Sequence, residues 1–393
     1  MKSAIILVPG YYGTRLVRKA DRSLVFISLT QALFGDQSLT LPVPGLGFEG
    51  TTELEPDGIL DEVGVIPPFY SIDVYGSLLD RLSTSTHPSL EVIPFTYDWR
   101  EDLMEAVQSL DTLIHRLQAE GTERISLVAH SMGGLIVSYY LRYGTQDIDS
   151  AVETWQGAEG IQEVVMAGVP FLGVMNSFRN MNFGATVGWN SSLLSAEAYA
   201  SFPASYYTLP VADIDELLTL ERKPIKGFIR KATQWQQSGW GLLKTSKTLS
   251  PQIDERRADY TSHWLQRSQR FLELLRAPTT TTSPHRPSLL YVYAKGTPTL
   301  AKGIWKGNQV TGPDSLLFED PEITASHAEG MANGFFVDGD GTVPVPSALL
   351  PSAYRQSFPT TMREYEVGHT ELVTRRTIQK DILTFLNGRK PPI

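Results

Sequence analysis

Short hydrophobic runs alternate along the chain with longer stretches in which hydrophobic residues recur at helical spacing. The runs suited to buried strands lie at residues 4–8, 91–95, 125–128, 161–166, 289–293 and 363–367. The helical patterns lie at residues 70–82, 103–117, 135–140, 260–276 and 371–386. This alternation predicts an α/β protein whose mostly parallel, doubly wound sheet is covered by helices on both faces.

Residues 174–285 interrupt the alternation and predict a cap inserted into the core, which would then comprise residues 1–173 and 286–393. The insertion contains four of the seven tryptophans, which are Trp189, Trp235, Trp240 and Trp264. Two interpretations stay open for these side chains. They pack in the cap's own small core, or they bind an acyl chain or contact a lipid surface.

Three connecting segments differ in what they predict. Residues 35–68, rich in glycine, proline and acidic residues, predict a long surface excursion without a defined element. The Thr/Pro-rich residues 277–284 predict a flexible return to the sheet. The motif Tyr97-Asp-Trp-Arg100 ends one predicted strand and opens the next helix, so Asp98 is expected to be a helix N-cap and loop anchor rather than a catalytic acid.

A serine lies at the corner between the predicted strand 125–128 and the helix that follows it. Ala129-His-Ser-Met-Gly133 is the small-x-Ser-x-small pattern of a nucleophile elbow, although Ala129 stands where glycine is usual. The flanking residues are small because strand and helix pass very close together at such a turn. The pattern alone is also compatible with an ordinary strand–helix connection, so Ser131 needs partners to become a candidate nucleophile.

In an elbow-type hydrolase the acid and then the base follow the serine in the sequence. His369 comes after a strand-like run and a glycine and leads into a helical pattern, so it is the candidate base. The other histidines precede the serine, lie in a helix or connector, or come before the acid: His87, His115, His130, His263, His285 and His327. The side chain of His130 is expected to point away from the Ser131 hydroxyl.

The candidate acid lies in Val337-Asp-Gly-Asp-Gly-Thr-Val-Pro344, a glycine-rich turn that can expose a carboxylate at a strand end. Asp340 is the first choice and Asp338 the second. The same residues resemble the opening of a calcium loop, but Leu349 stands where the bidentate glutamate belongs, so calcium is not expected. No Walker motif, dinucleotide fingerprint or zinc-like histidine pair appears, and no cofactor or metal is expected.

Together these motifs resemble the lecithin:cholesterol acyltransferase and lysosomal phospholipase A group of α/β-hydrolases, in particular its bacterial members. The matching stretches are Ile6-Leu-Val-Pro-Gly-Tyr-Tyr-Gly13, Pro94-Phe-Thr-Tyr-Asp-Trp-Arg100, Ala129-His-Ser-Met-Gly133, Ala167-Gly-Val-Pro-Phe-Leu-Gly173, Gly339-Asp-Gly-Thr-Val-Pro344 and Gly368-His369. The resemblance implies an α/β-hydrolase fold with a cap. It also implies that the backbone N–H of Tyr12, paired with that of Met132, meets the developing oxyanion.

Composition narrows the classes of partner. The 393 residues carry a formal charge of -9, which argues against a nucleic-acid partner and against a purely electrostatic grip on anionic membranes. The absence of cysteine excludes disulfides and thiolate metal sites. No transmembrane segment or secretory signal is recognisable, so a cytoplasmic location is expected.

These observations predict a serine-dependent ester hydrolase or O-acyltransferase that acts on lipid or other carboxylic esters. Ser131 would attack the carbonyl, His369 would carry the proton and Asp340 would orient His369. The expected partners are an ester substrate and, for acyl transfer, an alcohol, with transient contact to a lipid surface as a further option. Two alternatives stay open: a catalytically silent binding protein on the same fold, and an amidase or protease.

Overall fold

The computed structural model describes residues 2–27, 38–48, 53–65, 70–84, 90–187, 190–212, 217–244, 250–318 and 334–388. A parallel sheet of six strands forms the centre of the molecule. In spatial order the strands are β19 (Thr360–Glu366), β14 (Ser288–Lys295), β9 (Ile161–Ala167), β8 (Thr122–His130), β1 (Lys2–Val8) and β7 (Leu90–Pro94). Each strand predicted from a hydrophobic run is confirmed.

Helices cover both faces of this sheet. They are α2 (Gly76–Thr84), α3 (Leu103–Ala119), α4 (Met132–Tyr143), α11 (Val345–Ala348), α12 (Ser352–Ser357), α13 (Glu371–Thr374) and α14 (Arg376–Leu386). Alternate side chains of β1 enter two separate hydrophobic cores: Ile6 packs in the core that contains α3 and α4, whereas Ile5 and Leu7 pack in the core that contains α2 and α14. Successive strand residues point to opposite faces, which is why a doubly covered strand is apolar throughout.

Smaller strands extend the loops around the sheet. They are β2 (Thr14–Arg18), β3 (Leu24–Phe26), β4 (Leu54–Ile59), β5 (Glu62–Val65) and β6 (Tyr70–Asp73). The prediction that residues 35–68 lack defined elements is wrong, because β4 pairs with β2 and β5 pairs with β6. In addition, Leu39 and Leu41 are buried, so the part of this excursion that the structure describes does not lie only on the surface.

Two predicted helix boundaries also need correction. The pattern at 70–82 begins as strand β6, and the helix starts only at Gly76. Between them, the carbonyl of Asp61 accepts hydrogen bonds from the backbone N–H groups of residues 74, 75 and 76. The pattern at 371–386 forms two helices, α13 and α14, separated at Arg375, whose ψ of 123° is extended. In both cases a hydrophobic stripe continues across a backbone that changes direction.

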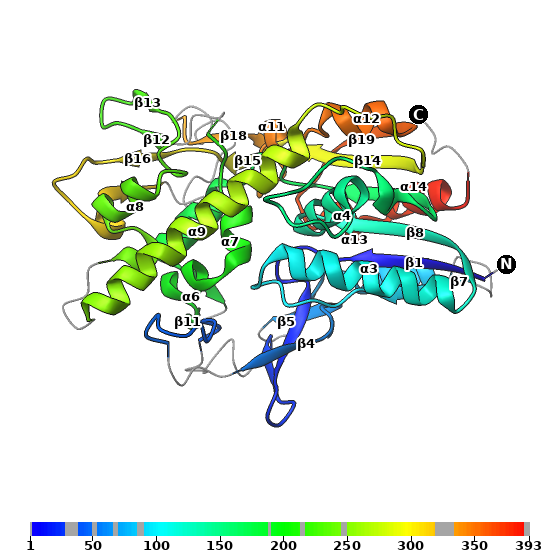
Figure 1. Cartoon of the computed structure of the whole chain (residues 1–393), viewed down its shortest axis with the longest axis horizontal. Coiled ribbons are helices and arrows are strands. Elements are labelled where there is room, and N and C mark those ends of the chain that lie inside the picture. The colour runs from blue at the N-terminus through cyan, green and yellow to red at the C-terminus, as the bar shows by residue number, and fades with distance from the viewer. Residues whose placement is uncertain are drawn as a thin grey trace.

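The inserted region forms a mainly helical layer beside the sheet, at the left of Figure 1. The long helix α9 runs diagonally across this layer. Its elements are α5 (Met175–Phe183), β10 (Ala185–Val187), β11 (Asn190–Leu194), α6 (Ala196–Ser201), α7 (Pro203–Tyr207), β12 (Leu217–Leu218), β13 (Pro224–Ile225), α8 (Ala232–Ser238) and α9 (Pro251–Arg276). Short 3-10 helices lie at η1 (Gln156–Ala158), η2 (Gly241–Leu243) and η3 (Gly312–Ser315). Within the described residues, no helix is long and apolar enough to cross a membrane, and the cellular location stays a prediction.

A later part of the chain joins the inserted region. Between β14 and β19 the described residues form β15 (Thr297–Leu300), β16 (Gly303–Trp305), β17 (Leu316–Leu317) and β18 (Phe336–Gly339). Strand β16 pairs with β12, so residues 303–317 complete a four-stranded sheet with residues 217–225. The division of the chain at residues 174 and 285 stays a prediction, and we propose that residues 303–317 belong with the cap.

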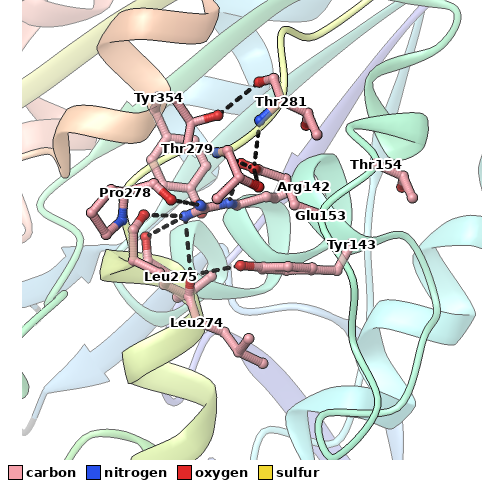
Figure 2. A network of polar contacts seen from close by, with 12 residues as sticks. Arg142, Tyr143, Glu153, Thr154, Leu274, Leu275, Pro278, Thr279, Thr281 and Tyr354 are labelled. Carbon is pink, nitrogen blue, oxygen red and sulfur yellow. Dashed lines mark hydrogen bonds and ion pairs between the residues drawn. The ribbon is translucent and has the colours of Figure 1, made fainter.

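A buried arginine links the helix after the elbow to the end of the inserted region (Figure 2). The guanidinium of Arg142, at the end of α4, donates hydrogen bonds to the carbonyls of Leu274, Ala277 and Pro278 and forms a 2.9 Å ion pair with Glu153. Glu153 in turn accepts hydrogen bonds from the backbone N–H groups of residues 280 and 281. Side chains from elsewhere in the sequence therefore contact the Thr/Pro-rich return, and its flexibility stays a prediction.

Candidate active site

Ser131 lies on the strand–turn–helix corner that the sequence predicts. Strand β8 ends at His130, α4 begins at Met132, and Ser131 between them has φ 55° and ψ -127°, a conformation that is unfavourable for a residue with a side chain. Its backbone N–H is fixed by a 2.8 Å hydrogen bond to the carbonyl of Ala167. A side chain at Gly133 would place its Cβ 2.4 Å from the carbonyl oxygen of Val8, which explains the small residue at this position.

Three predicted site residues form one continuous chain of hydrogen bonds. Nε2 of His369 lies 2.9 Å from Oγ of Ser131, and Nδ1 of His369 lies 2.7 Å from Oδ2 of Asp340. These residues are separated by 238 and 29 positions in the sequence. The arrangement has the geometry of a nucleophile, a base and an orienting acid.

The Asp340 carboxylate is buried and held from two sides. Oδ1 accepts hydrogen bonds from the backbone N–H groups of Thr342 (2.9 Å) and Val343 (2.6 Å), while Oδ2 faces the His369 ring. Burial by itself raises the pKa of Asp340, but His369 and the two N–H groups outweigh burial and hold the pKa below its usual value. Asp340 therefore stays ionised at neutral pH and can keep a proton on Nδ1 of His369.

The alternative acid is placed differently. Asp338 is exposed, and its Oδ1 accepts a 2.6 Å hydrogen bond from the backbone N–H of Gly296. It lies on β18, which pairs with β15 outside the main sheet, and Asp340 follows directly after the end of that strand. The geometry thus favours the first choice of acid over the second, and its catalytic role stays a prediction.

A glycine makes room for the histidine ring. A Cβ built on Gly168 would lie 3.1 Å from Cε1 and 3.2 Å from Nδ1 of His369. Gly168 also has φ 61°, a left-handed conformation that glycine adopts without strain. On the other side of the loop, the backbone N–H of His369 donates a 2.8 Å hydrogen bond to the carbonyl of Asp340. Backbone contacts therefore set the position of the ring.

The loop after β1 approaches the serine closely. A Cβ on Gly10 would lie 2.7 Å from the Cβ of Ser131, so only glycine permits this approach. Tyr12 has φ 66°, and Tyr12 and Met132 line one cavity together with Ser131. Both residues expected at the oxyanion site are thus beside Ser131. Their role as N–H donors stays a prediction.

The Tyr97-Asp-Trp-Arg100 motif holds this loop in place. The hydroxyl of Tyr97 donates to the carbonyl of Pro9 at 2.8 Å, and the indole N–H of Trp99 donates to the carbonyl of Thr14 at 2.9 Å. Sequence reasoning singled out the motif but did not predict these contacts, because they join residues 85 or more positions apart. The motif is therefore part of the support for the candidate oxyanion loop.

The prediction that Asp98 is a helix N-cap is wrong, whereas its role as a loop anchor is confirmed. The N-cap of α3 is Asp102, whose side chain accepts a 3.1 Å hydrogen bond from the backbone N–H of Met104. Asp98 instead binds the buried guanidinium of Arg100 through both carboxylate oxygens, at 2.9 and 2.6 Å. Two acidic residues four positions apart can both open a helix, and the side-chain geometry selects the later one.

Two residues that the sequence analysis left without a role connect the candidate oxyanion loop to the candidate base. The hydroxyl of Tyr75 accepts a 2.8 Å hydrogen bond from the backbone N–H of Gly10 and lies 2.9 Å from Nδ1 of His130. Nε2 of His130 lies 3.2 Å from the carbonyl oxygen of His369. As predicted, the bonds of the His130 ring go to groups other than the Ser131 hydroxyl.

A cavity of about 230 Å³ opens beside Ser131. Its walls come from the loop with Tyr11 and Tyr12, from the start of α4, and from helices α5, α6 and α7 of the inserted region. The polar side chains in its lining include Asn176, Ser177, Asn180, Ser205, Thr208 and Thr342. A larger hollow of about 910 Å³, lined in part by His115 and His285, contains none of the three hydrogen-bonded residues.

The tryptophans of the inserted region do not line this cavity where the structure describes them. Trp235 and Trp240 are fully buried, 6.2 Å apart between ring centroids, and both pack against Phe178. Trp264 is partly buried against Tyr260 and Tyr207, whereas Trp189 lies outside the described residues. For Trp235 and Trp240, the interpretation as packing of the cap's own core is therefore correct.

The described residues contain no cluster of three or more His, Asp or Glu side chains placed to hold a metal ion.

Comparison with known proteins identifies a family and several similar proteins. Residues 46–379 match the family described as Lecithin:cholesterol acyltransferase. The uncharacterized protein YJR098C of Saccharomyces cerevisiae (strain ATCC 204508 / S288c) is 26% identical over 266 residues, which are 66% of this chain and 35% of that protein. The chain thus spans about a third of the length of this curated relative. The crystal structure of the Tle4-Tli4 complex aligns over 98% of both chains with a TM-score of 0.53 and 16% sequence identity. The family resemblance and the α/β-hydrolase fold are confirmed.

Proposed function

Because the chain belongs to the lecithin:cholesterol acyltransferase family, we propose that it is a serine-dependent ester hydrolase or O-acyltransferase that acts on lipid esters through an acyl-enzyme. The observation that carries this proposal is the hydrogen-bonded chain from Ser131 through His369 to Asp340, with distances of 2.9 and 2.7 Å. A fold alone does not define an activity, whereas a nucleophile, a base and an orienting acid in contact support one.

In the proposed reaction Oγ of Ser131 attacks the ester carbonyl carbon as its proton passes to Nε2 of His369. The ionised Asp340 carboxylate stabilises the imidazolium that forms and keeps the remaining proton on Nδ1. His369 then gives its proton to the oxygen of the departing alcohol, the bond between that oxygen and the acyl carbon breaks, and the acyl group stays on Ser131.

The tetrahedral intermediate carries a negative charge on the former carbonyl oxygen. We assign its stabilisation to the backbone N–H groups of Tyr12 and Met132. Both residues line the cavity at Ser131, Tyr12 from the loop after β1 and Met132 from the start of α4. Met132 is the first residue of α4, so its N–H lies at the positive end of the helix dipole. Preorganised donors of this kind typically contribute about 100- to 1,000-fold in turnover each.

The second half of the reaction has two possible acceptors. Water gives hydrolysis, and an alcohol gives acyl transfer, with His369 as the general base in both cases. Both routes share every step up to the acyl-enzyme. They are distinguished by the product, which is a free acid in one case and a new ester in the other.

The test compares wild type with Ser131→Ala on p-nitrophenyl butyrate. We expect a loss of about 10,000-fold or more, because the variant keeps the fold but lacks the nucleophile. A fluorophosphonate probe should label wild type and not the variant. Ser138→Ala is the matched control, since Ser138 lies buried in the same helix α4 but outside the site.

The alternatives predict different outcomes in the same assays. A silent binding protein would show neither labelling nor ester turnover. An amidase or protease would cleave a p-nitroanilide as well as the matched p-nitrophenyl ester, whereas an ester-specific enzyme would cleave the ester alone. Transfer is measured by adding a series of alcohols and a sterol and separating the new ester from the free acid.

A further inference from the structure

The cavity at Ser131 is lined by apolar and uncharged polar side chains, and its described lining carries no formal charge. Among the described residues that line it there is no Asp, Glu, Lys, Arg or His. An anionic or cationic group placed there would lose its hydration without gaining an opposite charge, which is strongly unfavourable. The lining therefore selects against a charged group next to the scissile ester.

Uncharged polar groups are nevertheless part of the lining. Asn176 and Asn180 are one turn apart on α5, so both amides lie on the same side of that helix. The hydroxyls of Ser177 and Thr208 are paired at 2.7 Å, so together they still offer acceptor oxygens. Uncharged donors and acceptors of this kind match hydroxyl groups.

Tyr199 adds an unsatisfied polar atom to the wall. It belongs to α6, lines the cavity and is 3% exposed. Its hydroxyl has no hydrogen-bond partner among the described residues. A buried hydroxyl without a partner is uncommon in folded proteins, and a hydroxyl-bearing ligand would satisfy this one once a small shift of the ring exposes it to the cavity. The neighbouring Tyr11 differs, since its hydroxyl is already paired with Ser205 at 2.7 Å.

The size of the cavity limits what enters it. A volume of about 230 Å³ is below the range of about 300–1,000 Å³ that is usual for sites that enclose a drug-sized ligand. The cavity therefore fits a short group better than a long acyl chain.

We propose that this cavity binds one arm of the ester substrate, and that this arm is small, uncharged and hydroxyl-bearing. The proposal rests on the ester chemistry proposed above and specifies its substrate class. A hydroxyl-bearing arm can come from the alcohol, as in a glyceryl ester, or from the acyl group, as in a hydroxy acid. The chemistry that recognises it is the same in both cases.

The experiment measures kcat/KM for matched short esters on the full chain. Ethyl butyrate has no hydroxyl, glyceryl monobutyrate carries hydroxyls on the alcohol arm, and ethyl 3-hydroxybutyrate carries one on the acyl arm. We expect at least one hydroxyl-bearing ester to exceed ethyl butyrate by about 3- to 10-fold, which is the effect of one or two satisfied hydrogen bonds. Butyrylcholine and monoethyl succinate, which are charged, should fall about 10-fold or more below ethyl butyrate.

Variants link this preference to the cavity. Tyr199→Phe and Asn180→Leu should each lower the ratio between the preferred hydroxyl-bearing ester and ethyl butyrate to near 1. Tyr206→Phe is the matched control, because its hydroxyl bonds to the carbonyl of Ala200 and it does not line the cavity, so the ratio should persist. Asn180→Lys should raise kcat/KM for monoethyl succinate relative to ethyl butyrate by about 10-fold, since it supplies the missing charge.

Two results would overturn the inference separately from the proposed function. One is efficient turnover of ethyl butyrate with no preference for either hydroxyl-bearing ester. The other is a preference that Tyr199→Phe and Asn180→Leu both leave intact. In contrast, failure of wild type to cleave any of these esters, p-nitrophenyl butyrate included, would overturn the proposed ester chemistry and this inference with it.

Discussion

The hydroxyl of Tyr75 lies 2.9 Å from Nδ1 of His130, and both side chains are buried. The same hydroxyl accepts the N–H of Gly10, so its own proton is free to be donated to Nδ1. The proton of neutral His130 is then on Nε2, which faces the carbonyl of His369 at 3.2 Å. Tyr75 and His130 thus join the loop beside Ser131 to the backbone of the candidate base.

This relationship predicts that Tyr75→Phe lowers turnover without removing any group that contacts substrate. The variant leaves the N–H of Gly10 and Nδ1 of His130 without partners, so the loop and the His369 backbone lose a common support. We expect kcat to fall about 10-fold with little change in KM. This is the result expected when a variant loses an interaction that stabilises the transition state but not the bound substrate.

Tyr354→Phe is the control for this prediction, because it removes a buried hydroxyl that bonds to the carbonyl of Ser138 instead. A purely structural role for Tyr75 would lower stability in both variants and leave kcat unchanged in both. Steady-state kinetics together with urea unfolding separate these outcomes.

The buried His130 ring also predicts how stability depends on pH. Burial, and then the nearby His369, lower the pKa of His130 to about 3. In the unfolded chain the pKa returns to about 6.5. Between these values only the unfolded state binds the proton, so the free energy of unfolding rises with pH by about 1.4 kcal/mol per unit from this group.

His130→Asn should remove that contribution. Urea unfolding at several pH values between 4 and 6.5 measures it as the difference in slope between wild type and variant. All other titrating groups are common to the two proteins, so parallel slopes would contradict the assignment of His130 as a buried neutral ring.

Asp340 and Asp338 are expected to respond very differently to the same substitution. Asp340→Asn should lower kcat about 10,000-fold, because an amide cannot hold the proton on Nδ1 of His369. Asp338→Asn should stay within about 3-fold, since Asp338 is exposed and bonds only a loop N–H in the described structure. Kinetics on p-nitrophenyl butyrate decide between them, and a crippled Asp338→Asn with a normal Asp340→Asn would reverse the assignment of the acid.

The buried tryptophans of the inserted region predict a loss of stability rather than of substrate selectivity. Trp235→Ala and Trp240→Ala each remove an aromatic ring that is fully buried, and we expect a cost of about 3–5 kcal/mol. The remaining folded enzyme should lose activity equally on esters of every chain length. Thermal unfolding and a chain-length series below the micelle concentration test both parts, and a loss confined to long chains would show that these rings contact the acyl chain.

The buried ion pair of Figure 2 predicts that the end of α9 depends on one side chain. Arg142→Met removes the donors to four backbone carbonyls and leaves Glu153 without its charge partner, which typically costs about 3–5 kcal/mol. Burial raises the pKa of Glu153, but hydrogen bonds from Thr280 and the charge of Arg142 outweigh it and hold the pKa below its usual value. This stabilisation is present at neutral pH and is lost as the pH falls through the lowered pKa.

Limited proteolysis with intact-mass detection measures this effect. We expect earlier cleavage in residues 277–281 for Arg142→Met than for wild type. Arg276→Met is the control, because Arg276 lies at the same end of α9 and its guanidinium is only partly buried. Equal cleavage of both variants would show that the ion pair does not anchor the connector.

Local pattern by itself determined the strands, the elbow and the order of the chemistry-bearing residues. A strand covered by helices on both faces must be apolar throughout, and a sharp turn from strand to helix needs small residues on either side of the serine. Both features can therefore be recognised from a few consecutive residues. Ser131, Asp340 and His369 could be selected because their order along the chain and their positions after strand-like runs limit the choices. The family motifs are likewise short and contiguous.

Only the tertiary structure decided which groups meet across the sheet. Tyr75 and Gly10 are 65 residues apart, and His130 and His369 are 239 apart, so no local periodicity reports these bonds. The same holds for the Thr/Pro-rich connector, whose composition indicates flexibility but whose anchor Glu153 lies 127 residues earlier. The uncharged cavity is a further case, since its walls come from separate helices and loops. Side-chain chemistry is specified by the sequence, whereas the partner of each side chain is specified by the packing of elements that are distant along the chain.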